Sequence, residues 1–141
     1  MGVGMEQAII FALISTVVFG ITAIIYKLIK VDPYLLVFTV YLFSTIITGT
    51  FLVLRGQISS IMQISTQNVI LLITVSLLAI VGMTSFILAI QSGKVAVVTP
   101  IRNMSLIVTV IIAVLFLGEK LTIMKMLGVA LGAIALVLLS V

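Results

Sequence analysis

The sequence predicts an all-α membrane protein with five transmembrane helices. Apolar residues make up 64% of the 141 residues and charged residues 7%, and the mean hydropathy is +1.58. A soluble domain has too little interior to bury so large an apolar fraction. The apolar residues also fall into five segments with short polar joints, and the charges lie mostly at the segment ends. We therefore expect one polytopic domain over residues 1–141.

Each of the five segments is long enough to cross a bilayer. A helix rises about 1.5 Å per residue, so 20 residues span a hydrocarbon core of roughly 30 Å. Turn-forming residues separate the segments, among them Pro33, Gly56 and Gly118, and we expect Gly93 to supply the unusual backbone angles of a tight reversal. The expected helices are residues 7–26, 34–54, 69–90, 95–117 and 122–141.

The fourth segment contains the most informative polar cluster, Pro100, Arg102 and Asn103. Proline removes a backbone donor, and an arginine about 10 Å inside the helix must reach water or a partner. We therefore expect the guanidinium to lie in a wet vestibule or near lipid headgroups. It either attracts an anionic or carboxylate-bearing ligand, or it snorkels to lipid phosphate, and the sequence leaves both interpretations open.

Several other polar or small residues are candidates for the same pathway or for helix packing. Thr84, Ser85 and Gln91 could face a cavity beside the fourth helix, although hydroxyls also bond to the backbone of their own helix. Gly128 and Gly132 are four residues apart, a spacing that lets another helix approach closely but also arises by chance.

Composition excludes several kinds of chemistry. The chain has no cysteine and no histidine, which excludes disulfides, thiol chemistry and most zinc or haem ligation. We expect no metal, no cofactor and no enzymatic reaction, because paired acids are also lacking. The pI of about 9.8 reflects basic residues beside the membrane edges, so we expect contact with lipid headgroups and not with nucleic acid.

An odd number of crossings would place the two termini on opposite sides of the membrane. The basic residues do not favour either orientation, since one side carries Arg55, Lys120 and Lys125 and the other carries Lys27, Lys30 and Lys94. Such a balance permits insertion both ways and therefore permits an antiparallel pair.

Motifs along nearly the whole chain resemble a single EamA-type unit of the drug/metabolite transporter superfamily. They are Phe19-Gly20 followed by Lys27, Pro33 opening the second helix, residues 93–100 (GKVAVVTP), residues 117–122 (LGEKLT) and Leu127-Gly128. The LGEKLT turn is the strongest of them. The sequence departs from the family pattern at Val40, where an arginine is common, and at Leu106, where a second proline is common.

The resemblance implies one half of a ten-helix inverted-repeat transporter, whose substrate cavity lies between two five-helix repeats. It implies a half-size secondary transporter that moves small metabolites or amphiphilic compounds by alternating access, as a homodimer in the cytoplasmic membrane of a prokaryote. The expected substrate pathway comprises Arg102, Pro100, Asn103, Thr84, Ser85 and Gln91. The competing class is a non-transporting accessory subunit whose helices only bind other helices.

The positions of charged residues bear on the transport mechanism. The related small multidrug-resistance proteins depend on a glutamate inside helix one, whereas residues 9–18 contain no acid, which disfavours proton-coupled export of organic cations. Lys27 is either a snorkelling anchor or a substrate ligand. Glu119 is explained as a cap at the positive end of the fifth helix.

Overall fold

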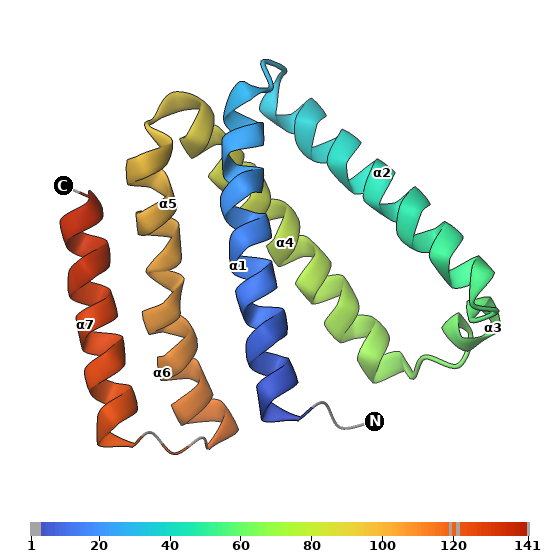
Figure 1. Ribbon diagram of the computed structural model, residues 1–141. Coiled ribbons are helices and arrows are strands. Elements are labelled where there is room, and N and C mark those ends of the chain that lie inside the picture. Colours follow the sequence, from blue (N-terminus) through green and yellow to red (C-terminus); the bar gives the residue numbers. More distant parts are fainter. Residues whose placement is uncertain (1–3, 119, 121, 141) are drawn as a thin grey trace. The chain divides into compact units, whose positions relative to one another are not determined.

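The computed structural model describes residues 4–118, 120 and 122–140, and every regular element in that part of the chain is a helix (Figure 1). This confirms the all-α class. The helices are α1 (Met5–Leu28), α2 (Pro33–Leu54), α3 (Ile58–Ile61), α4 (Thr66–Ser92), α5 (Val95–Asn103), α6 (Ser105–Leu117) and α7 (Ile123–Ser140). Glu119, Leu121 and Val141 lie outside the described residues, and with them the expected capping role of Glu119.

Local sequence explains the start of α2 and the end of α6. The Asp32 carboxylate caps α2 by accepting hydrogen bonds from the backbone N–H groups of Tyr34 (2.9 Å) and Leu35 (3.1 Å), and Pro33 occupies the first turn, where its missing donor is harmless. Gly118 ends α6 in the left-handed conformation, with φ of 64°. The long joint after α2 contains the single-turn helix α3.

The reason expected for glycine at position 93 is wrong. Positive φ angles occur at Gly56 and Gly118 among the described glycines, not at Gly93, so unusual backbone angles do not explain it. The turn is instead crowded, because a Cβ at Gly93 would lie 3.0 Å from the carbonyl oxygen of Ala89 and 3.0 Å from a methyl group of Val98. Glycine fits this turn because a Cβ would require these neighbours to shift.

The segment expected as one helix over residues 95–117 is two helices, α5 and α6, that meet at Met104. The N–H of Met104 bonds to the carbonyl of Ile101 (3.1 Å), and that of Ile107 bonds to the carbonyl of Met104 (3.0 Å). Both bonds span three residues, so the backbone tightens into a 3₁₀-like turn shortly after Pro100. The break follows Pro100 without a second proline, since residue 106 is leucine.

The chain divides into two compact units. The first comprises Met1–Ile29 and Ala89–Val141, and the second comprises Lys30–Leu88. Within the first unit, α5 contacts both α1 and α7, and α6 contacts α7. In Figure 1, α1 and α7 run in the same direction and α5 and α6 run opposite to them. The start of α1 and the end of α7 therefore lie at opposite ends of this unit.

In the second unit, the threonine side chains of α2 bond to the backbone of their own helix. Four threonine hydroxyls of α2 donate to the carbonyl four residues earlier, at 2.6–2.8 Å: Thr39, Thr45, Thr48 and Thr50. Back-bonding of this kind lets hydroxyls face hydrocarbon without an unsatisfied donor. The polar residues of α2 are thus compatible with a lipid-facing surface.

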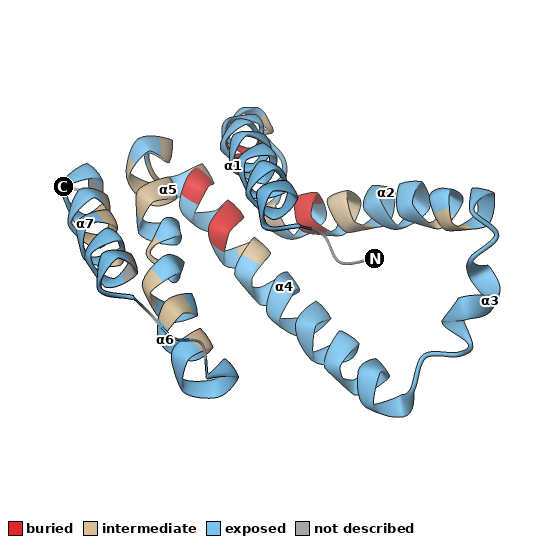
Figure 2. Cartoon of the chain, turned by 60° about the horizontal axis from the view of Figure 1, so that its bottom comes forward, coloured by how far each residue is buried: buried red, intermediate tan, exposed pale blue. Residues whose placement is uncertain are grey.

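Large apolar side chains are mostly exposed, as Figure 2 shows by the predominance of the exposed colour. The buried residues in the described part of the chain are all apolar: Ala23, Tyr26, Leu36, Val37, Phe86, Ile87 and Ile90. Four segments are long and apolar enough to cross a membrane, namely Met5–Leu28, Pro33–Leu54, Thr66–Ser92 and Val95–Leu117, and α7 contains the shorter apolar stretch Met126–Leu139. An exterior of this kind fits lipid and not water.

Candidate transport cavity and family membership

The first unit contains a cavity of about 770 Å³ between α1, α5, α6 and α7. All the residues that line it belong to that unit: Ser15, Thr16, Phe19, Gly20, Thr99, Arg102, Asn103, Ser105, Leu106, Thr109, Gly132, Ala135 and Leu136. The volume lies within the range of small-molecule sites. The walls combine one cation, one amide, several hydroxyls and apolar side chains.

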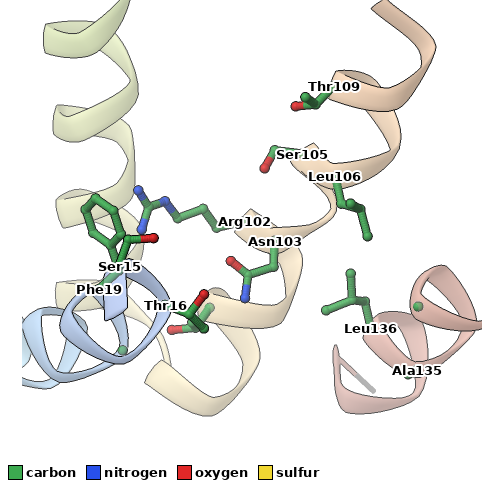
Figure 3. A pocket seen from close by; sticks show the side chains of 13 residues that line it. Ser15, Thr16, Phe19, Arg102, Asn103, Ser105, Leu106, Thr109, Ala135 and Leu136 are labelled. Carbon is green, nitrogen blue, oxygen red and sulfur yellow. The ribbon is translucent and has the colours of Figure 1, made fainter. Parts of the chain in front are cut away.

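Arg102 forms the charged part of the wall. Figure 3 shows its side chain extending from α5 towards Phe19 and Ser15 of α1, and the guanidinium carbon lies 5.6 Å from the centre of the Phe19 ring. A cation over an aromatic face gains roughly 0.5–1 kcal/mol at an exposed site. The Arg102 side chain is exposed. The aromatic ring therefore orients the guanidinium while leaving it accessible from the cavity.

The hydroxyls of α1 present mainly acceptor oxygens to the cavity. The Ser15 and Thr16 hydroxyls both donate to the carbonyl of Ala12, at 2.8 and 2.9 Å. Thr99, on the α5 wall, has a buried hydroxyl with no hydrogen-bond partner in the described part of the chain. Such a group costs about 1–3 kcal/mol when it stays unsatisfied, so a polar ligand that reaches it gains binding energy.

The opposite end of the cavity is apolar. Leu106 of α6 and Leu136 of α7 face each other in Figure 3. A Cβ at Gly132 would lie 3.5 Å from a methyl group of Leu106, an ordinary packing distance, whereas a Cβ at Gly128 would meet nothing within 4 Å. Of the two expected packing glycines, Gly132 therefore lies at the α6–α7 contact and Gly128 faces open space.

The structure brings some of the expected pathway residues together and separates others. Arg102 and Asn103 line the cavity, and Pro100 belongs to the same helix but is not among the lining residues. Thr84 and Ser85 belong to the second unit, where the Ser85 hydroxyl donates to the carbonyl of Val81 (2.8 Å). The Gln91 side chain donates instead to the carbonyl of Ile29 (3.4 Å).

Sequence reasoning missed the remaining wall residues, although a helical pattern reveals part of them. From Thr99 through Arg102 or Asn103 to Leu106 and Thr109, the steps are three or four residues, the spacing of one helix face, and this spacing continues across the break at Met104. The α1 wall carries no comparable polar signal, since serine and threonine are common in membrane helices. Only the tertiary structure shows that Phe19 faces Arg102.

A scan against protein-family models matches the EamA-like transporter family over residues 6–141. The chain belongs to the EamA-like transporter family. This confirms the resemblance noted from the motifs, and it identifies an integral membrane protein of the drug/metabolite transporter type. Members of this family are transporters rather than enzymes.

One relative of this EamA-like protein is an uncharacterized protein of the archaeon Methanocaldococcus jannaschii. It is 28% identical over 138 residues, which cover 97% of this chain and 98% of the relative. The relative therefore has nearly the same length as this chain. No solved structure matches the chain significantly.

The cavity wall of this EamA-like protein is mixed in polarity. In the described residues there is no group of three or more histidines, cysteines, aspartates or glutamates that could hold a metal ion. The wall instead pairs a cation and hydrogen-bonding groups with apolar surface. Walls that combine a few polar groups with apolar surface are typical of small-molecule sites in general.

Proposed function

We propose that the protein is a half-size carrier that moves small metabolites or amphiphilic compounds through the cavity of its first unit by alternating access. The observation that carries this proposal is the polar wall around Arg102 and Asn103, which lines a cavity within helices that are otherwise apolar outside. Ionisable groups at membrane depth are costly, and those that occur face the bundle interior or a water-filled cavity and mark substrate pathways. An accessory subunit whose helices only bind other helices would not need a polar cavity wall.

The wall also indicates the preferred substrate charge. Arg102 supplies a fixed positive charge with planar donors, which suits a carboxylate, and Leu106 and Leu136 suit an apolar substituent. The Thr99 hydroxyl offers a further hydrogen bond. We propose small anionic or carboxylate-bearing amphiphiles as the substrate class.

We further propose that the working form is a homodimer of ten helices. Support comes from the family's two-repeat architecture, from the relative of single-unit length and from the exposure of the cavity-lining arginine. A five-helix unit leaves such a cavity incompletely enclosed, and a second copy would complete it. The balance of basic residues at the two membrane faces is compatible with an antiparallel pair.

Transport into liposomes tests the function. Purified protein should take up a carboxylate-bearing aromatic probe at least about tenfold faster than its neutral amide, since charge-assisted hydrogen bonds contribute about 1.5–3 kcal/mol. Native mass spectrometry of the same preparation should give twice the chain mass. A chain that binds other membrane proteins but moves neither probe would support the accessory-subunit alternative, and a strictly monomeric chain would contradict the dimer.

A further inference from the structure

The end of α1 is tied to the turn between α4 and α5 by one side chain. The Lys27 ammonium donates to three backbone carbonyls, those of Ile90 (2.9 Å), Gln91 (3.1 Å) and Gly93 (2.8 Å). All four residues belong to the first unit. Three carbonyls therefore converge on a single nitrogen.

This geometry matches what an ammonium can donate and what a helix end requires. A lysine ammonium carries three N–H donors, and all three are used here. Ile90 and Gln91 lie in the last turn of α4, where carbonyls have no partner within the helix and where the helix dipole favours a cation. Lys27 thus caps a helix to which it is not adjacent in sequence.

We call the three hydrogen bonds from Lys27 to the carbonyls of Ile90, Gln91 and Gly93 the Lys27 tie. Two further features indicate that this tie is specific to the turn between α4 and α5. The Gln91 side chain donates back to the carbonyl of Ile29, at 3.4 Å, so the two segments are bonded in both directions. A Cβ at Gly93 would lie only 3.0 Å from the Ala89 carbonyl oxygen and 3.0 Å from a Val98 methyl group, so the backbone whose carbonyl Lys27 binds is closely packed. The turn between α4 and α5 is therefore closely packed around the Lys27 ammonium.

We infer that Lys27 is a positioning residue that holds α1 and α5, the two facing walls of the cavity, at a fixed separation. The inference deepens the proposed function, because these helices carry Phe19 and Arg102 and so set the width of the proposed substrate site. It replaces both interpretations from the sequence, since an ammonium bonded to three carbonyls is neither a lipid anchor nor a substrate ligand.

Arginine distinguishes this role from the other two. A lipid anchor or an anion ligand at position 27 accepts arginine, which is equally charged and binds phosphate or carboxylate well. The tie does not accept it, because a planar guanidinium cannot direct its donors at three carbonyls that converge on one point. Lys27→Arg should therefore fail as Lys27→Gln does.

The test measures the separation of the walls directly and needs no substrate. The chain has no native cysteine, so spin labels can be placed only at Ile10→Cys on α1 and Ile101→Cys on α5, both exposed and outside the cavity lining. Labelled chains are diluted with unlabelled chains, and the distance distribution is recorded by double electron–electron resonance. Lys30→Gln, three residues further along and exposed, is the charge-matched control.

We expect a narrow distribution in the parent protein and in Lys30→Gln, and loss of that narrow distribution in Lys27→Gln and Lys27→Arg. A distribution that stays narrow in Lys27→Gln, or in Lys27→Arg alone, overturns the inference. Because this readout does not involve transport, it can succeed or fail independently of the proposed function.

A second variant disturbs the same tie while Lys27 stays in place. Gly93→Ala forces the crowded turn to shift and should move the carbonyl of Gly93 away from the ammonium, which broadens the distribution as well. In the double variant Lys27→Gln/Gly93→Ala, broadening should be no greater than in the worse single variant, because both act on one interaction. Additive broadening in the double variant contradicts a shared tie.

Discussion

Two arginines of this protein lie over phenylalanine rings, but in different settings. Arg55, at the end of α2, lies 4.5 Å from the ring centre of Phe51, one helical turn earlier in the same unit. Arg102 lies 5.6 Å from the ring centre of Phe19, which belongs to another helix and lines the cavity with it. The first pair follows from helix geometry alone, whereas the second exists only because α1 and α5 pack together. The same contact is thus local support in one place and a candidate binding element in the other.

Removal of the charge should give the largest difference between the two pairs. Arg102→Gln should reduce liposome uptake of a carboxylate probe roughly 10- to 150-fold, equivalent to the loss of a charge-assisted contact of about 1.5–3 kcal/mol. Arg55→Gln should leave uptake within about twofold, since exposed cation–π pairs contribute little. Size-exclusion profiles check that both variants remain folded. Equal losses in the two variants would remove any special role of Arg102.

A change of shape at constant charge should have an intermediate effect. Arg102→Lys keeps the positive charge but loses the planar, bidentate donors and stacks less well on Phe19, so uptake should fall roughly three- to tenfold. Arg55→Lys should change nothing measurable. Full activity of Arg102→Lys would mean that a point charge suffices and that the contact with Phe19 is incidental.

Removal of the ring should give the smallest effect. Phe19→Leu keeps apolar volume but loses the cation–π contact, and a cost of about 0.5–1 kcal/mol corresponds to a roughly two- to fivefold increase in KM for the probe. Phe51→Leu is the matched control and should leave KM unchanged. An altered maximal rate with an unaltered KM in Phe19→Leu would contradict a role in substrate binding.

The two arginine–phenylalanine pairs also illustrate which features can be predicted from sequence: those within one helix can, and those between helices cannot. Short-range features were predictable in outline, namely the turn before α2 at Pro33, the turn at Gly118 and the apolar spans, whereas the unusual backbone angles expected at Gly93 occur at Gly56 and Gly118. The family followed from motifs, and it is confirmed over residues 6–141.

Features that depend on two segments meeting in space were not predictable. Lys27 has three carbonyl partners more than 60 residues away in sequence, and nothing local distinguishes it from a snorkelling lysine. The α1 wall of the cavity was hidden for the same reason. The break at Met104 was also not predicted. Pro100 indicates that the helix is disturbed, but it does not indicate the residue at which the helix is interrupted.

The central claim is that the cavity of the first unit is a water-accessible substrate pathway, and cysteine accessibility tests it most directly. The chain has no native cysteine, so Thr109→Cys, on the cavity wall and well inside the Val95–Leu117 span, provides a single reactive thiol. Thr74→Cys, in α4 of the second unit and outside the cavity lining, is the control. A membrane-impermeant maleimide should label Thr109→Cys in liposomes and not Thr74→Cys, and the carboxylate probe should slow that labelling. If Thr109→Cys is as unreactive as the control, the cavity is not a pathway and the account is wrong.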